Sequence, residues 1–346
     1  MTSRRVTLVD VAEAAGVSRT AVSLVLSGRG SELRISTEVQ QRIRRTAEEL
    51  RYRPNAVSQN LRTGTTRTIG FVSDTVATSR LAGDMIKGAL EAAREQGFLL
   101  FIGETEGDHD LERELLQAMA DRQVEGIILA YMYTQRVAVP PGMDATRSVL
   151  LNALPQSPAA VPSVIPDEVE AGRTVARILL DAGHRDGIHL IGAGPGVADI
   201  PPGGVAAFER LQGMREVFDA AGVEISSGKL CREWLPPDGH RATRALLRRT
   251  RPKALVCFND RLALGVYQAI EDAGLSVPTE VSVISFDDHP IASWIRPKLT
   301  TIALPHYDLG RTAVDLLLAS EESSPGTVVR VPMLPRLRDS VAPPSA

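Results

Sequence analysis

The sequence predicts a small all-α head followed by a larger α/β body, and three observations lead to this fold class. Residues 6–28 have the pattern of two short helices joined by one tight turn, as in a helix-turn-helix. From residue 66 to about residue 340, apolar strand patterns alternate with helical ones, which predicts parallel sheets with right-handed crossovers. A segment of this length exceeds one open sheet, so the body is predicted to form two doubly wound subdomains.

The first two helices of the head have clear boundary signals. Thr7 can cap the first helix, with Asp10 three residues later as its capping-box partner. Gly16 is expected to end this helix, because glycine readily adopts the left-handed conformation of a C-cap. Ser18 can then cap the second helix. Its apolar positions are expected to face the first helix, which leaves Arg19, Thr20, Ser23 and Leu24 facing outward.

An exposed Arg and Thr on the first turn of a second helix is what recognition of a DNA major groove requires. The alternative is an ordinary helical hairpin with a solvated face. A third helix is expected after Ser36, ending before Pro54, which disfavours the α conformation at the residue before it. Residues 56–64 could form a short helix that orders on DNA and inserts Leu61 into the minor groove, or a plain linker.

The charge distribution supports a head that contacts phosphate groups. The whole chain carries a net charge of −3, but residues 1–64 contain eleven arginines, no lysine and six acidic residues. The head is therefore +5 and the remainder −8. A basic head on an acidic body suits phosphate contact at one end only.

The body contains two series of strand and helix patterns. Strands are expected at 68–74, 98–103, 124–132 and 148–153 in the first series, and in the segments GIHLIGA, ALVCFND and VSVISFDD of the second. Ligands of such sheets bind at the carboxyl ends of the strands, here in a cleft between the subdomains. The candidate residues at these positions are Asp74, Asn152, Asp167, Arg210, Trp234, Asn259 and Asp287.

Carboxylate, amide and guanidinium groups beside an aromatic ring suit the hydroxyls and ring faces of a sugar. The alternative for each residue is a role in a helix cap or a turn. Asp260, next to Asn259, is a further candidate whose alternative is to cap the helix that follows. Arg80, in the loop after the first strand, could favour a phosphorylated or acidic sugar, or could simply pair with Asp84.

Several functional classes find no support in the sequence. The glycines of GAGPGV miss the spacing of a dinucleotide loop, and no hydrolase, metalloprotease or P-loop motif occurs, so an enzyme is not expected. No metal site or cofactor is expected either, since the histidines are dispersed and Cys231 and Cys257 fit no ligand spacing. The cysteines are expected to be free and buried. No signal peptide or membrane span is expected, which favours a cytoplasmic location.

Two long segments resemble the lactose/galactose-repressor family of transcription factors. They are TLVDVAEAAGVSRTAVSLVLSG, followed by ISTEVQQRIRRTAEELRYRPNAVSQNLRTGTTRTIGFV. The phrases CFNDRLALGVYQAIEDAGLSVPTEVSVISFDD and LTTIALPHYDLGRTAVDLLL extend the resemblance through the body. It implies a periplasmic-binding-protein-like body with an effector between its subdomains, and effector contacts at Arg210, Trp234, Asn259 and Asp287.

The resemblance also implies roles for residues of the head. Arg19 and Thr20 occupy base-reading positions, and Leu61 is the hinge residue that enters the minor groove. Leu24 stands where many members carry an arginine, and a leucine can contact a thymine methyl but cannot donate to guanine. The full set of implied DNA contacts is Thr7, Ser18, Arg19, Thr20, Ala21, Ser23, Leu24, Asn55 and Leu61.

We therefore expect a sequence-specific DNA-binding regulator, most simply a repressor, that is controlled by a sugar-like effector. A homodimer would place two heads on a near-palindromic operator. The expected divisions are a head at 1–54, a hinge helix and linker at 55–65, and an effector-binding and dimerisation domain at 66–340. The alternative is a sugar-binding protein of the transport or sensory type, for which the basic head would have no use.

Overall fold

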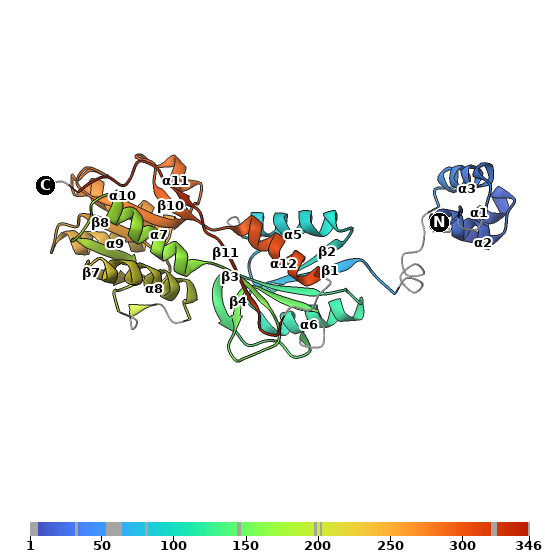
Figure 1. Cartoon of the computed structure of the whole chain (residues 1–346), viewed down its shortest axis with the longest axis horizontal. Coiled ribbons are helices and arrows are strands. Elements are labelled where there is room, and N and C mark those ends of the chain that lie inside the picture. The colour runs from blue at the N-terminus through green and yellow to red at the C-terminus, as the bar shows by residue number, and fades with distance from the viewer. Residues whose placement is uncertain are drawn as a thin grey trace. The chain divides into compact units, whose positions relative to one another are not determined.

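The chain forms two units, Met1–Thr66 and Arg67–Ala346, which are considered separately (Figure 1). The computed structural model describes residues 6–31, 34–52, 64–79, 82–143, 147–196, 199–200, 203–319 and 324–344.

The first unit contains three helices, as the sequence predicts. They are α1 (Leu8–Ala15), α2 (Arg19–Leu26) and α3 (Thr37–Glu49). The predicted capping box is confirmed, because the Thr7 amide donates to the Asp10 carboxylate at 2.7 Å and the Thr7 hydroxyl accepts from the Asp10 amide. Gly16 ends α1 in the left-handed conformation, with φ +64°. Ser18 and Ser36 cap the next two helices.

The core of this unit is small. Val11 of α1, Val22 and Val25 of α2, and Ile43 of α3 are fully buried against one another. These positions lie one helical turn apart within α2, so a single stripe of that helix faces the core. The opposite stripe of α2 remains available to a partner.

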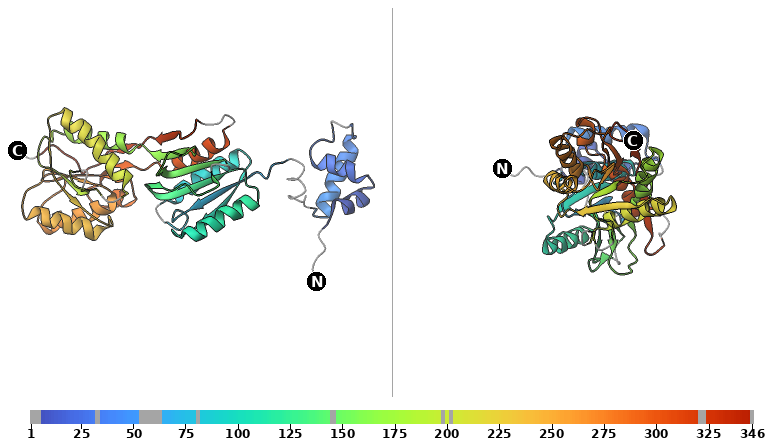
Figure 2. Two further views of the ribbon diagram at one scale, coloured as in Figure 1. Left: turned by 90° about the horizontal axis from the view of Figure 1, so that it is seen from below. Right: turned by 90° about the vertical axis from the view of Figure 1, so that its left-hand side faces the viewer.

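The second unit contains two six-stranded sheets, each flanked by helices (Figure 2). The first lobe has the strand order β11-β5-β4-β3-β1-β2 and is entirely parallel. Its strands are β1 (Thr68–Ser73), β2 (Leu99–Glu104), β3 (Ile127–Val137), β4 (Ser148–Pro155), β5 (Ser163–Pro166) and β11 (Val328–Val331). Its helices are α5 (Gly83–Glu95), α6 (His109–Asp121) and α12 (His306–Leu318).

The second lobe has the order β12-β10-β9-β8-β6-β7, parallel except for the short β12. Its strands are β6 (Ile188–Gly192), β7 (Ile225–Leu230), β8 (Ala254–Cys257), β9 (Ser282–Asp287), β10 (Thr300–Ala303) and β12 (Pro335–Arg336). Its helices are α7 (Glu168–Asp181), α8 (Val205–Ala220), α9 (Pro236–Leu247), α10 (Asp260–Asp272) and α11 (Ile291–Trp294). The doubly wound organisation that the sequence predicts is thus present in both lobes.

The first sheet buries both of its faces. In β3, Ile128 packs in the cluster that contains α5 and α12, whereas Ile127 and Leu129 pack in the cluster that contains α6. Adjacent residues of a strand point to opposite faces, so one apolar run can serve two cores. This explains why the central strands are continuously hydrophobic rather than alternating.

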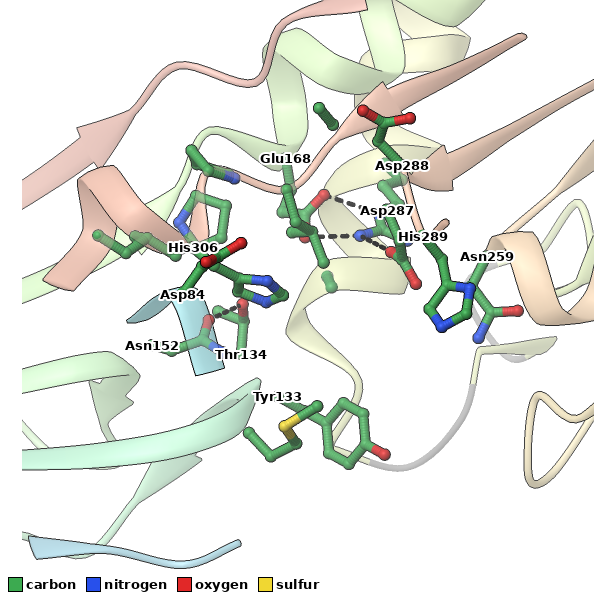
Figure 3. A pocket seen from close by; sticks show the side chains of 18 of the residues that line it. Asp84, Tyr133, Thr134, Asn152, Glu168, Asn259, Asp287, Asp288, His289 and His306 are labelled. Carbon is green, nitrogen blue, oxygen red and sulfur yellow. Dashed lines mark hydrogen bonds and ion pairs between the residues drawn. The ribbon is translucent and has the colours of Figure 1, made fainter. Parts of the chain in front are cut away.

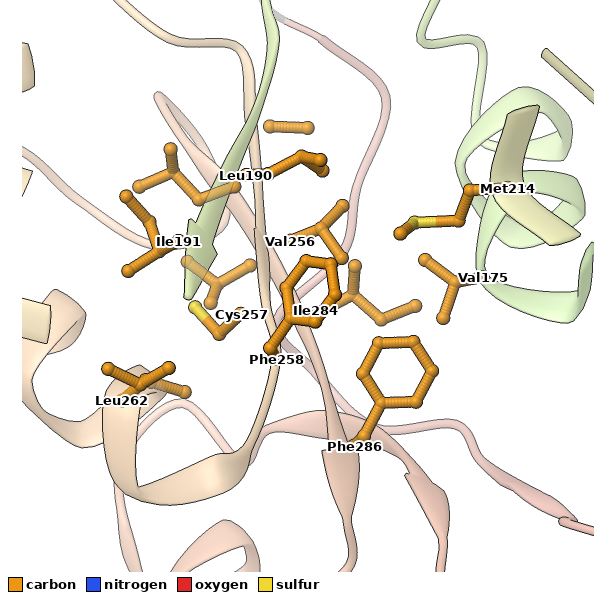
Figure 4. Packing of buried hydrophobic residues seen from close by; sticks show 14 of the residues in the cluster. Val175, Leu190, Ile191, Met214, Val256, Cys257, Phe258, Leu262, Ile284 and Phe286 are labelled. Carbon is orange, nitrogen blue, oxygen red and sulfur yellow. The ribbon is translucent and has the colours of Figure 1, made fainter. Parts of the chain in front are cut away.

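The second sheet has one continuous core, shown in Figure 4. Leu190, Val256 and Ile284 come from its neighbouring strands β6, β8 and β9, and helices α7 and α8 cover them. Phe258 directly follows β8, and Phe286 is the second-last residue of β9. Their ring centroids lie 6.2 Å apart. Cys231 and Cys257 are free and buried, as predicted.

The chain passes between the lobes at three places. Segment 166–168 connects β5 to α7, segment 303–306 connects β10 to α12, and segment 331–335 connects β11 to β12. Strands and helices that come late in the sequence therefore complete the first lobe. These crossovers bring the carboxyl ends of both sheets toward the same region.

Candidate functional site

The exposed face of α2 is the candidate DNA-binding surface. The Ser18 hydroxyl accepts a hydrogen bond from the Ala21 amide at 3.2 Å, which fixes the start of the helix. Because Val22 is buried on the opposite stripe, Arg19 and Thr20 are exposed in the first turn. Their side chains are thus free to reach base edges, as a recognition helix requires.

The other predicted DNA contacts lie around this turn or outside the described residues. Ala21, Ser23 and Leu24 are half-buried along α2, and Thr7 is exposed at the start of α1. The remaining two predicted contacts, Asn55 and Leu61, lie outside the described residues.

The body contains a cavity of about 1010 Å³ between its two lobes (Figure 3). It lies at the carboxyl ends of strands from both sheets, where open α/β folds bind ligands. Five of the predicted effector residues line it: Asn152 from β4, Arg210 from α8, Trp234 before α9, Asn259 after β8, and Asp287 at the end of β9.

Arg210 occupies the second-lobe wall of this cavity in an almost fully buried position. Its Nε donates to Glu168 Oε2 at 2.6 Å and its Nη2 donates to Glu168 Oε1 at 2.8 Å. Its Nη1 donates to the Phe258 carbonyl at 2.5 Å, and its guanidinium stacks 4.3 Å from the Phe286 ring centre. Asp287 lies further away, with 3.7 Å between its Oδ1 and Nη2 of Arg210. The two parallel hydrogen bonds between Arg210 and Glu168 fix both side chains.

The two asparagines are held by hydrogen bonds on opposite walls. Asn152 accepts from the Thr134 hydroxyl at 2.6 Å and donates to the Tyr131 carbonyl at 3.0 Å. Asn259 accepts from the Leu262 amide at 2.8 Å, so it caps α10, and it donates to the Trp234 carbonyl at 3.2 Å. Asn259, and not the neighbouring acid, is therefore the cap of that helix.

Four of the nine described non-glycine residues with positive φ lie at the cavity. Asn152, Trp234, Asp287 and Asp288 all have positive φ values, of +58°, +52°, +109° and +55°. All four line the cavity. Residues other than glycine adopt this conformation at a cost, and such strain is typically retained at functional sites.

Asp287 has an unusual protonation equilibrium. Burial raises its pKa to about 8, although the Arg210 guanidinium acts in the opposite direction. A carboxyl group with this pKa is largely protonated at neutral pH and can donate a hydrogen bond. The wall formed by Glu168, Arg210 and Asp287 therefore offers hydrogen-bonding groups with little net positive charge.

Two predicted effector residues are not among those that line the cavity. Asp74 accepts from the Met132 amide at 3.0 Å and from the Thr75 amide at 2.5 Å, and burial raises its pKa. Asp167 caps α7 by accepting from the Glu170 amide at 3.2 Å. Asp167 thus makes the helix-cap contact that was its alternative, whereas Asp74 combines a turn contact with a hydrogen bond from β3. Arg80, the remaining predicted effector residue, lies outside the described residues.

Comparisons with known proteins identify the same two parts of the chain. Residues 7–55 match the bacterial regulatory proteins of the lacI family, and residues 176–341 match the periplasmic binding protein-like domain. The ribose operon repressor of Escherichia coli (strain K12) is 31% identical over 317 residues, which cover 90% of this chain and 92% of that repressor. The chain belongs to the lacI family.

Further relatives agree with this assignment. The HTH-type transcriptional repressor PurR of Vibrio vulnificus (strain CMCP6) is 28% identical, over 90% of this chain and 91% of that repressor. The lac repressor dimer bound to operator and the anti-inducer ONPF has a TM-score of 0.80 at 25% identity, over 98% of this chain and all of that one. The lacI-family chain is thus a DNA-binding transcriptional regulator, and a transport-type binding protein without a DNA-binding head is not supported.

Several cavity residues of this lacI-family protein were not predicted. Glu168 follows Asp167 directly, yet nothing in its local pattern shows that it pairs with a residue 42 positions later. Arg261, on the first turn of α10, and Asp84 and His306, at the starts of α5 and α12, also line the cavity. The only local signal is that each follows a strand or begins a helix.

The described residues offer neither a metal-binding cluster nor a membrane-spanning helix. No group of three or more His, Cys, Asp or Glu side chains in the described part of the chain could hold a metal ion. Within the same residues, no helix is both long and apolar enough to cross a lipid bilayer.

Proposed function

We propose that this lacI-family protein is a repressor that binds a near-palindromic DNA operator as a homodimer and responds to a sugar-like effector. The observation that carries the proposal is the pairing, in one chain, of an exposed Arg19–Thr20 turn with a polar cavity lined by Arg210, Asn259 and Trp234. The lac repressor dimer bound to its operator has the same fold. Binding to DNA places its site of action in the cytoplasm.

The expected divisions of the chain accord with this role. A head at 1–54 would bind the half-site, a hinge at 55–65 would bind the minor groove, and the body at 66–340 would bind the effector and a second subunit. Two heads related by a two-fold axis would contact half-sites about one helical turn apart. We assign no catalytic step to the protein.

The test is binding of the full-length protein to DNA from upstream of its own gene, at one fixed salt concentration, with and without a panel of sugars. Fixed salt is essential because phosphate contacts make affinity depend on salt. Selective binding that one sugar alters would support the proposal. Equal affinity for this DNA and for random DNA, with every sugar, would contradict it.

Arg19→Ala provides the residue-level test of the head. Loss of a side chain that reads a base is expected to weaken operator binding by about 1–3 kcal/mol and to affect random DNA much less. Arg45→Ala is the matched control, since Arg45 is exposed on α3 and pairs with Glu49 at 3.7 Å. If both variants lose the same operator affinity, Arg19 contributes charge and not sequence recognition.

A further inference from the structure

The charge of Arg210 is already neutralised within the cavity wall. Glu168 meets it with two hydrogen bonds, and the side chains are only 3% and 1% exposed. The third nitrogen is bound to the Phe258 carbonyl, so each nitrogen of the guanidinium has a partner from the chain itself. An anionic ligand would have to compete with a buried carboxylate for this cation.

The remaining charges of the lining do not favour an anion either. Six carboxyl side chains and four guanidinium groups line the cavity, so the acidic groups outnumber the basic ones even with Asp287 protonated. Arg336 is also engaged, because its Nε lies 3.4 Å from an oxygen of Asp288. Transfer of a phosphate or carboxylate from water into such a cavity carries a desolvation cost, and Arg210 and Arg336, which already have partners, do not offset it.

An uncharged polyhydroxyl compound meets no such penalty. Its hydroxyls can donate to carboxylates and accept from amide or guanidinium groups, so the same wall provides partners for both. The half-buried Trp234 packs against Phe258 in an edge-to-face arrangement, with 5.7 Å between ring centroids, and its indole nitrogen donates to the Gly192 carbonyl. Its ring is thereby fixed in the cavity wall as an apolar surface for a sugar ring.

We propose that Glu168 determines the charge class of the effector: by pairing with Arg210 it makes the cavity selective for an uncharged polyol over the corresponding sugar acid or sugar phosphate. This inference rests on the proposed function, because it concerns the ligand of the same cavity. It assigns Glu168 a specificity role in addition to a structural one.

Arg261 is the residue through which an anion could still bind. It lines the cavity, and its buried Nε has no hydrogen-bond partner among the described residues. If an anionic sugar binds tightly to the native protein, this guanidinium is the expected contact. The test therefore includes Arg261→Gln.

The experiment measures ligand binding to the full-length protein by calorimetry. The ligands are matched sets of glucose, glucuronate and glucose 6-phosphate, of galactose and galacturonate, and of ribose and ribose 5-phosphate. In the native protein, the best neutral sugar should bind about tenfold or more tightly than its anionic counterpart. In Glu168→Gln, the affinity for the anionic counterpart should rise about tenfold relative to that for the neutral sugar, because the substitution removes one negative charge from the wall.

Glu170→Gln is the matched control. Glu170 lies on the same helix and pairs with Arg173 and Arg177, but it does not line the cavity. This variant should keep the native preference. An equal gain for anions in Glu168→Gln and Glu170→Gln would overturn the proposal, as would no gain in Glu168→Gln.

The native protein alone also tests the proposal if Glu168→Gln does not fold. Tighter binding of an acid or phosphate than of its neutral parent would overturn it, and loss of that binding in Arg261→Gln would identify the site. The proposed function would survive that result, since a sugar derivative would still bind. Failure of every sugar, neutral or anionic, to bind or to change operator affinity would instead contradict both the effector site and the inference built on it.

Discussion

Asp260 shows how one buried carboxyl group makes stability depend on pH. It lies directly after the Asn259 cap and is completely buried beneath the ends of β9 and β10. Its carboxylate accepts from the Ser285 and Thr301 hydroxyls, the latter at 2.8 Å, and from the His289 amide at 2.7 Å. Burial nevertheless dominates and raises its pKa from 3.8 to about 7.

The sign of the effect follows from this raised pKa. An acid that is harder to ionise in the folded state destabilises the fold as pH rises from its unfolded pKa to its folded pKa. Relative to Asp260→Asn, the native protein should therefore lose stability between about pH 4 and pH 7. Thermal unfolding of both proteins across this range measures the difference.

The control for this prediction is Asp219→Asn, at an exposed position near the end of α8. Its melting temperature should follow that of the native protein at every pH. A constant difference between native protein and Asp260→Asn from pH 4 to pH 8 would show that Asp260 ionises as it does in the unfolded chain.

At the scale of elements, pairs of glycines set the distances between helices. A Cβ on Gly88 of α5 would lie 2.0 Å from the Tyr307 carbonyl oxygen of α12, and one on Gly310 of α12 would lie 1.9 Å from the Met85 oxygen. The same reciprocal arrangement joins α7 to α8 through Gly172 and Gly213. It also joins α9 to α10 through Gly239 and Gly265. Each pair of helices meets backbone to backbone because neither glycine has a side chain.

This arrangement predicts opposite effects for one substitution made at two positions of α5. Gly88→Ala should destabilise the body by about 2 kcal/mol or more, because overpacking outweighs the gain of up to about 1 kcal/mol in helix propensity. Gly83→Ala is the control, since a Cβ there meets no atom within 4 Å. It should be neutral or slightly stabilising. The melting temperatures of the two variants measure this difference in stability. Equal values would mean that α5 and α12 can move apart with no loss of stability.

At the scale of the whole molecule, the edge strand β2 is the candidate dimer surface. Among the described strands it pairs only with β1, and it exposes Leu99 and Phe101, at 66% and 40%, together with Ile102. Exposed apolar edge strands promote association, and a two-fold axis would place the same patch of a second copy against this one. In the chain, this strand lies between α5 and α6.

Phe101→Glu should therefore shift the protein from dimer to monomer, because a charge would be buried in an apolar interface. Sedimentation at micromolar concentration measures the change. Leu337→Glu is the control, at a residue that is 69% exposed beyond β12 in the other lobe. If Phe101→Glu sediments as the native protein does, the second subunit is bound by another face.

The predictability of the fold depends on how local its signals are. The caps at Thr7, Ser18 and Ser36 and the buried strands β1, β3 and β4 follow from patterns within a few residues. Helix α9 and strand β7 were not predicted. Helix α9 begins with two prolines and contains Gly239, which resembles a loop until α10 is present to pack against it. Strand β7 is an exposed edge strand with little apolar character.

The candidate site divides in the same way. Residues at strand ends and in the first turn of α2 can be predicted, because a strand end or a cap is visible in the local sequence. This reasoning placed Asn152, Asn259 and Asp287 beside a cavity. It also included Asp167, which caps its own helix, and Asp74, which accepts from the next amide in the chain and from an amide of β3. An acidic residue at the end of a strand looks the same in the sequence whether its side chain faces a ligand or caps the helix that follows.

The sequence by itself therefore determined the family, the two parts of the chain, the helix-turn-helix and five of the cavity residues, because these depend on contiguous patterns. Only the tertiary structure decided which charges meet. Glu168 and Arg210 are brought together by the close contact of α7 and α8, where Gly172 and Gly213 remove the side chains that would separate the helices. Long-range pairing is a property of the packed helices, and no local pattern in the chain records it.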